Sequence, residues 1–212
     1  MCWRQLVLIG LLVSSCREIE PVSPGQVFSG YQINGIVTNA SGIPLEGIEL
    51  RLFYEYGVRY PAQDTAQLFV SDSVNTIQAE VFDGDARLVR SFSIARFTGY
   101  LRRKIWDQKD STSQSVKSGL YTIIVYFNGV FVKQYRWLIE GNVSAMTDLN
   151  GQFSIPKSCL PIGEIVDLYD PQGNYADTFD IIAVVDLVIP NVPGYVSVPL
   201  TRDQITRVTI IL

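Results

Sequence analysis

The chain has 212 residues, of which 47% are hydrophobic and 18% charged, a composition that excludes a predominantly disordered protein. The length allows one large domain or two small ones. Its 17 Lys and Arg against 21 Asp and Glu give a formal net charge of −4, which excludes a strongly basic protein that binds nucleic acid through its overall charge.

The N-terminal segment is typical of an export signal. Arg4 precedes an apolar run over 6–13, which is too short for a membrane span because a spanning helix needs about 20 apolar residues. The next four residues, Val13-Ser14-Ser15-Cys16, resemble a bacterial lipobox. The resemblance implies that a signal peptide, residues 1–15, is removed.

The same resemblance implies that Cys16 carries a diacylglycerol thioether and a further acyl chain, which together anchor a protein stably. Residues 16–30 contain Pro and Gly with little periodic apolar content and are predicted to be the tether. The alternative is an ordinary secretory signal in which Cys16 is incidental. We expect an exported protein anchored in a bacterial cell envelope; which membrane and leaflet stays open.

Cysteine usage agrees with this interpretation. If Cys2 leaves with the signal and Cys16 carries lipid, Cys159 is the remaining thiol, so we expect no intramolecular disulfide in the mature chain, and no C-x-x-C pair is present. The neighbours Ile155, Leu160 and Ile162 are apolar, which indicates a buried structural thiol rather than a reactive one.

From residue 31 onward, short apolar segments alternate with period two between turn residues, a pattern that predicts strands. No helical stripe of about ten residues interrupts them. We therefore expect antiparallel β-sandwiches. The predicted strands lie at 48–55, 77–82, 121–127, 131–139, 179–189, 195–200 and 208–212.

Charge divides the chain into two parts. Residues 72–140 contain ten Lys and Arg against seven Asp and Glu, whereas the rest of the mature chain has six against 14. This asymmetry indicates two modules.

The stretch Ile33–Leu50 is similar to the opening of the carboxypeptidase regulatory-like domain, a transthyretin-like β-sandwich. The Thr-Asp-x-x-Gly-x-Phe element that usually follows shortly in that family stands here at Thr147–Phe153, about ninety residues later. The resemblance therefore implies an insertion.

The insert has a resemblance of its own, carried by Ala79–Arg90, Gly99, Trp106–Asp110, Val116–Tyr121 and Gly129. These segments look like the immunoglobulin-like module of flagellar hook-capping proteins, which is also similar to type IX secretion sorting domains. About seventy residues follow the module here, whereas a sorting domain lies at the extreme C-terminus, so no sorting role is expected.

The residues of the insert suit structural roles. Gly84-Asp85 can turn a hairpin, Trp106 can fill the core, Asp107 and Asp110 can cap backbone amides, and Ser118-Gly119 can start a strand. The sequence departs from the family pattern at three positions where glycine is common: Ala86, Gln108 and Ser113.

The combined prediction is an all-β fold of two antiparallel sandwiches, immunoglobulin-like and transthyretin-like, one inserted in the other. Residues 31–71 plus 141–212 form the carboxypeptidase regulatory-like β-sandwich, and 72–140 form the inserted immunoglobulin-like β-sandwich.

Histidine is absent, which removes the commonest general base and zinc ligand and every Ser-His-Asp or Cys-His arrangement. No glycine-rich phosphate loop is present. We expect no catalytic residue, no metal site and no cofactor, and hence no enzyme.

Clustered carboxylates leave two other interpretations open. Asp148–Gly151, and Asp170–Asn174 with Asp177 and Asp180, offer oxygen ligands for calcium but lack a complete binding loop, so ordinary turns are favoured. Asp167 and Asp180 are the weakly supported carboxylate pair of a hydrolase.

Basic and aromatic residues give weaker signals. Arg102–Lys104 with Trp106 could form a nucleic-acid patch, but on a strand these cations alternate between faces, so a solvated face or a domain contact is favoured and no nucleic-acid partner is expected. Tyr56, Tyr60 and Tyr100 are candidates for stacking on sugar rings or a partner, with packing as the favoured role.

The leading hypothesis is a non-enzymatic, lipid-anchored envelope protein that serves as a structural or protein-interaction module. Its partners would be the membrane, through Cys16, and envelope proteins or glycans. The alternative is a carbohydrate- or nutrient-binding accessory lipoprotein.

Overall fold

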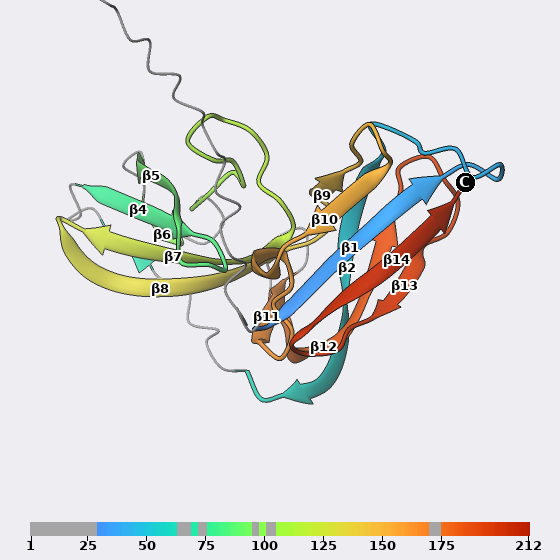
Figure 1. Ribbon diagram of the computed structural model, residues 1–212. Coiled ribbons are helices and arrows are strands. Elements are labelled where there is room, and N and C mark those ends of the chain that lie inside the picture. Colours follow the sequence, from blue (N-terminus) through green and yellow to red (C-terminus); the bar gives the residue numbers. More distant parts are fainter. Residues whose placement is uncertain (1–28, 63–68, 72–75, 95–97, 101–104, 170–174) are drawn as a thin grey trace, which may run out of the picture.

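The computed structural model describes residues 29–62, 69–71, 76–94, 98–100, 105–169 and 175–212. The fold is all-β, as predicted, and its sheets are almost entirely antiparallel (Figure 1). The strands are β1 (Tyr31–Thr38), β2 (Glu49–Tyr60), β3 (Phe69–Val70), β4 (Ile77–Phe82), β5 (Leu88–Ile94), β6 (Gly99–Tyr100), β7 (Gly119–Phe127), β8 (Val130–Ile139), β9 (Val143–Met146), β10 (Gln152–Ile155), β11 (Ile165–Tyr169), β12 (Tyr175–Val188), β13 (Val196–Pro199) and β14 (Gln204–Ile211). A 3-10 turn, η2 (Lys157–Cys159), follows β10.

Two sheets enclose the first hydrophobic core. One has the order β10-β1-β14, and the other has the order β11-β12-β2-β9 with β13 paired to β12. Alternation along the strands supplies the core: Ile33 and Val37 of β1 are fully buried, as are Leu50 and Leu52 of β2. We call this unit the outer sandwich.

One strand pair of the outer sandwich departs from the expected antiparallel arrangement. β14 runs parallel to β1 over its whole length, from Tyr31 opposite Gln204 to Thr38 opposite Ile211. A parallel partner requires a long connection, which the residues between these strands supply.

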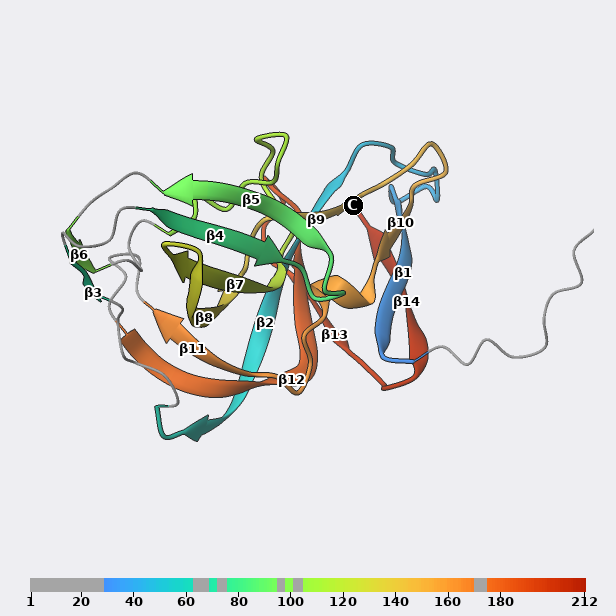
Figure 2. The same cartoon turned by 90° about the vertical axis from the view of Figure 1, so that its left-hand side faces the viewer.

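A second core lies under a four-stranded antiparallel sheet with the order β5-β4-β7-β8, which Figure 2 shows beside the outer sandwich. The sheet buries Ala79, Val81, Ile123 and Val125 on one face, where Trp106 packs against them. We call this unit, whose buried residues run from Val70 to Ile139, the inner unit. These limits lie close to the predicted boundaries at 72 and 140, and independent folding of the two units stays a prediction.

Four loops each contain a turn of the same kind. In each, the first residue's side-chain Oδ1 accepts hydrogen bonds of 2.8 to 3.0 Å from the amides two and four positions later, and the fourth residue's amide donates to the first residue's carbonyl. The four turns are Asn39–Ile43, Asp83–Arg87, Asp110–Gln114 and Asp148–Gln152.

The fourth residue of each turn has positive φ: 78° at Gly42, 58° at Ala86, 66° at Ser113 and 68° at Gly151. Gln108, at 60°, has the same left-handed conformation. The three positions of the insert where glycine is common in the similar family are thus positions that adopt positive φ without glycine.

Candidate functional site

A concavity of the described chain lies between the two units. It has a volume of about 770 Å³, which is within the range of small-molecule sites. One wall is the outer face of β4, β7 and β8, and the other is the segment from Lys157 to Glu164. Ser29, Gly30 and Arg202 close one end, so the chain enters the described fold beside this cleft.

The wall formed by η2 depends on two glycines of the inner unit. A Cβ atom on Gly84 would lie 2.8 Å from the carbonyl oxygen of Ser158, and a Cβ on Gly119 would lie 2.9 Å from the same oxygen. Any larger residue would displace the backbone there. The glycines therefore let the two units pack backbone to backbone at the base of the cleft.

Apolar side chains line much of the cleft. Phe82 and Ile124 come from the inner unit, and Leu160 and Ile162 come from the outer sandwich. Leu120 of β7 belongs to the core of the outer sandwich, so the two units are continuous at this point.

Charged groups stand at the rim. The Arg136 guanidinium donates to Glu164 at 2.5 Å and to the carbonyl of Ile165 at 3.2 Å, which ties β8 to β11. Lys157 and Arg202 also line the cleft. These groups, together with the apolar wall, could hold a small anionic ligand, but no buried nucleophile or acid–base pair stands among the described lining residues.

Cys159 lies behind the cleft wall and is buried, as its apolar neighbours predicted. Its carbonyl accepts a 2.8 Å hydrogen bond from the hydroxyl of Tyr54. Burial raises the pKa of the Cys159 thiol to about 11, so the group stays protonated at neutral pH. A protonated, inaccessible thiol is a structural group and not a nucleophile.

The carboxylate of Asp148 serves its turn. Its Oδ1 accepts from the amides of Asn150 at 2.9 Å and Gln152 at 2.8 Å, which is the turn-forming role favoured above calcium binding. No group of three or more potential metal ligands occurs within the described ranges. Residues 170–174 of the second candidate calcium segment lie outside them.

The remaining carboxylates of that segment have other surroundings. Asp177 pairs with Arg59 at 2.5 Å, and this hydrogen bond lowers the pKa of Asp177. Asp167 accepts a hydrogen bond from Thr178, which lies directly opposite it in the β11–β12 pair. Asp180 is a diagonal neighbour of Asp167 in the β11–β12 register, and its Oδ1 is buried without a hydrogen-bond partner in the described part of the chain. The two carboxylates therefore lie on adjacent strands of one sheet, and Oδ1 of Asp167 accepts the hydrogen bond from Thr178.

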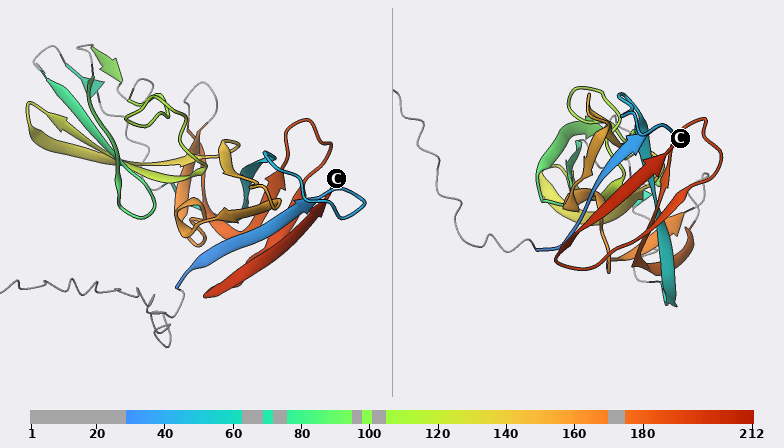
Figure 3. Two further views of the ribbon diagram at one scale, coloured as in Figure 1. Left: turned by 45° about the horizontal axis from the view of Figure 1, so that its top comes forward. Right: turned by 45° about the vertical axis from the view of Figure 1, so that its right-hand side comes forward.

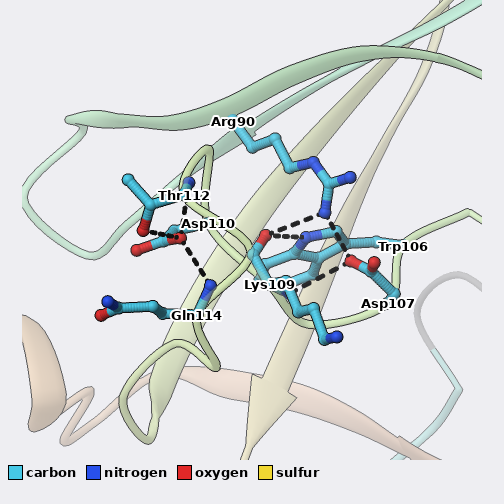
Figure 4. A network of polar contacts seen from close by, with 7 residues as sticks. All are labelled: Arg90, Trp106, Asp107, Lys109, Asp110, Thr112 and Gln114. Carbon is cyan, nitrogen blue, oxygen red and sulfur yellow. Dashed lines mark hydrogen bonds and ion pairs between the residues drawn. The ribbon is translucent and has the colours of Figure 1, made fainter.

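Trp106 is a buried core residue of the inner unit. Its ring lies 5.1 Å from that of Tyr121, and its Nε1–H donates to the carbonyl of Lys109 at 2.8 Å (Figure 4). Residues 102–104 of the predicted basic run lie outside the described chain.

Asp107 and Asp110 organise the loop that carries Trp106, as predicted. Asp107 accepts from Arg90 at 2.7 Å and from the amide of Lys109 at 3.2 Å (Figure 4). Asp110 accepts from the Thr112 hydroxyl at 2.7 Å, and this hydrogen bond is the main reason why the pKa of Asp110 is lowered.

Of the candidate stacking aromatics, Tyr56 has a ring contact within the described chain. Tyr56 is half-buried, with its ring 6.0 Å from that of Phe179, and Tyr60 is half-buried at the end of β2. The side chain of Tyr100 and the lipidation candidate Cys16 lie outside the described residues.

No protein-family model matches the chain, and no curated protein matches it in sequence. Within the described ranges, no helix has the length and apolar character required to cross a membrane.

Sequence reasoning did not find the cleft between the units. The one signal for it was the pair Gly84 and Gly119, which was assigned to turn formation and to the start of a strand. The structure shows in addition that both glycines accommodate the backbone of Ser158.

Proposed function

We propose that this chain is a non-enzymatic, lipid-anchored protein of a bacterial cell envelope whose two β-units form an interaction module. The observation that carries the proposal is Val13-Ser14-Ser15-Cys16 directly after a short apolar run. A thiol at that position permits diacylglycerol attachment, and two or more acyl chains suffice for stable anchoring.

The surroundings of the polar groups support a non-catalytic role. In three turns, a carboxylate oxygen accepts hydrogen bonds from backbone amides of the same turn; the residues are Asp83, Asp110 and Asp148. The chain has no histidine. What remains available for function is surface shape, apolar exposure and charge.

Metabolic labelling with a fatty-acid analogue tests the anchor in the full chain. We expect the natural protein to be labelled and Cys16→Ala to be unlabelled and unprocessed. Cys159→Ala is the matched control, because it removes the buried thiol and leaves the lipobox intact, and it should be labelled like the natural protein. Equal labelling of Cys16→Ala would refute the lipid anchor.

The alternative is a carbohydrate- or nutrient-binding accessory lipoprotein, and the observation that favours it is the 770 Å³ cleft. A glycan array probed with the full chain separates the two functions. Binding that is lost in Lys157→Ala or Arg202→Ala, both at the cleft rim, would favour the alternative. Absence of glycan binding would favour the interaction module.

A further inference from the structure

One end of the outer sandwich is covered by exposed apolar side chains. They come from four separate segments: the β1–β2 loop, the β9–β10 turn, the β12–β13 loop and the end of β14. The exposed fractions are 58% for Ile43, 78% for Leu149, 38% for Val192, 66% for Tyr195 and 66% for Ile211. We call these five residues the distal apolar end.

Hydrogen bonds join three of the segments, and strand pairing places the fourth, since the β12–β13 loop follows Val188, which lies opposite Arg51 near the start of β2. The amide of Val37 donates to the carbonyl of Gly151 at 2.8 Å, and the amide of Leu212 donates to that of Thr38 at 2.9 Å. Figure 3 shows these loops gathered around the C-terminus at one end of the outer sandwich. Exposed apolar side chains that gather on one surface mark an interaction site.

The backbone that presents the cluster is well supported. Ile43 ends the turn that begins at Asn39, and Leu149 is the second residue of the turn at Asp148, where side-chain oxygens cap the amides. Thr147 joins the two loops, since its hydroxyl donates to the carbonyl of Leu45 at 2.7 Å and accepts from the amide of Ile48 at 2.9 Å. Little conformational entropy is then lost on binding, which favours affinity.

The distal apolar end points away from the place where the chain enters the fold. The first described residues, Ser29 and Gly30, precede β1, and Thr38 at its other end adjoins the β1–β2 loop. Eight residues of strand at about 3.3 Å each separate the two ends by roughly 25 Å. A tether that ends at residue 30 therefore leaves this surface on the far side from the anchor.

The charge of this end identifies the kind of partner. Segments 39–48, 147–151, 189–195 and 209–212 contain no Lys or Arg, and they contain Glu46 and Asp148. Arg51, which lies opposite Val188 beside the β12–β13 loop, forms an ion pair with Glu49 at 3.7 Å. An apolar, acidic surface is repelled by anionic lipid headgroups. It is complementary to a protein surface on which apolar side chains are flanked by Lys or Arg.

We infer that the distal apolar end binds a partner protein through an apolar patch bordered by basic side chains. The existence of the surface is independent of lipidation, while its orientation away from the membrane rests on the proposed function.

Site-specific photo-crosslinking in the full chain, expressed in its native envelope, tests this inference. A benzophenone side chain is placed at Leu149 or Tyr195, and at Phe131 as a control. Phe131 is an apolar residue with 58% exposure on the β7–β8 hairpin of the inner unit. We expect both distal positions to give an adduct with the same protein, whose crosslinked peptide contains Lys or Arg, and Phe131 to give none.

Two substitutions then test the apolar and acidic contributions. Leu149→Asp and Glu46→Lys, each combined with the probe at Tyr195, should reduce the adduct at least tenfold. The matched control is Val130→Asp on the β7–β8 hairpin, which should leave it unchanged. All three should keep the melting temperature of the natural protein, because the replaced side chains are exposed.

Several outcomes would overturn the inference: adducts with lipid, adducts with a second copy of this chain, equal adducts at Phe131, or no adduct at either distal position. Failure of the anchor is distinguishable. If Cys16→Ala is labelled like the natural protein while the distal adducts persist, the lipid anchor is wrong and the binding surface stands. If labelling behaves as proposed and the adducts are absent, only the binding surface is wrong.

Discussion

Ala86 and Ser113 hold a backbone conformation that L-residues avoid. An L-residue in the left-handed conformation costs about 1–2 kcal/mol. Ala86 and Ser113 each occupy the fourth position of their turn, where the other two turns of the same kind have Gly42 and Gly151. The turn is maintained by the side chain at its first position and not by the residue that bears the strain. Each of the four loops, two in each unit, is thus held by one side-chain oxygen of its own Asp or Asn.

Replacing either strained residue by glycine should stabilise the protein. We expect Ala86→Gly and Ser113→Gly each to raise the free energy of unfolding by about 0.5–1 kcal/mol, since relief of strain exceeds the added entropy of the unfolded chain. Urea denaturation measures the change.

The reverse substitutions supply the control. Gly42→Ala should cost only the strain, because its Cβ would meet open space, whereas Gly151→Ala should cost more, because its Cβ would lie 2.5 Å from the carbonyl oxygen of Val37. A loss of stability in both Ala86→Gly and Ser113→Gly would contradict the strain argument.

Buried thiol and phenol groups make the stability of the protein depend on pH in the alkaline range. Burial is the main cause that raises the pKa values of Cys159, Tyr54 and Tyr121. Above about pH 9 the unfolded chain loses these protons while the folded chain retains them, so the unfolded state binds fewer protons and stability falls as pH rises.

Thermal unfolding measured from about pH 7 to about pH 10.5 should therefore show a falling melting temperature. Tyr54→Phe should weaken this dependence, although it lowers stability at neutral pH by about 1 kcal/mol through loss of the hydrogen bond to Cys159. A melting temperature that is constant over this pH range would be inconsistent with the raised pKa values.

At the scale of elements, η2 connects the two units. Its Ser158 carbonyl lies against Gly84 and Gly119, and its Cys159 carbonyl accepts from Tyr54. Three residues thereby join a turn of the inner unit, a strand start and β2. The connection is made of backbone atoms, so side-chain substitutions within η2 leave most of it in place.

Gly84→Ala tests this connection. We expect it to lower the free energy of unfolding by about 1–3 kcal/mol, as overpacking does, and to increase labelling of Cys159 by a maleimide, read as the mass of its peptide. Gly129→Ala is the control, since its Cβ would meet open space and only backbone strain would be added. Unchanged Cys159 labelling in Gly84→Ala would show that η2 does not depend on this contact.

Period-two alternation predicted the strands well because it reports burial on one face of a sheet. The segment predicted at 77–82 is β4, and the one predicted at 131–139 is β8 without its first residue. Alternation cannot report strand direction, and so the parallel β1–β14 pair was missed. η2 was missed because a three-residue turn has no periodicity. The cleft needs two surfaces far apart in sequence, which no local pattern contains.

On the scale of the whole molecule, two cores meet at a narrow junction. Leu120 and Leu138 of the inner unit pack against the outer core, and Arg136 pairs with Glu164. Most buried residues of each core nevertheless contact only their own core. An inner unit that is inserted into a discontinuous outer sandwich stays a prediction.

Excision tests the insertion directly. Replacing residues 72–140 with a short Gly-Ser linker should leave a folded outer sandwich that is less stable than the full chain, because it loses the contacts of Leu120 and Leu138. The excised segment should also fold, since it keeps all four strands of the inner sheet, but with lower stability because it lacks the buried side chain of Val70. Circular dichroism and denaturant unfolding measure both. If neither fragment folds, the chain is one cooperative unit.

The pairing of β1 with β14 determines when the outer sandwich can finish folding. The two strands that make up most of one sheet are separated by 173 positions, from Tyr31 to its partner Gln204. Contacts between residues so distant form slowly. While the chain emerges from a ribosome, β1 lacks its parallel partner until residues 204–211 have been added. The outer sandwich therefore stays open until β14 has been synthesised, and its folding is completed only after that point.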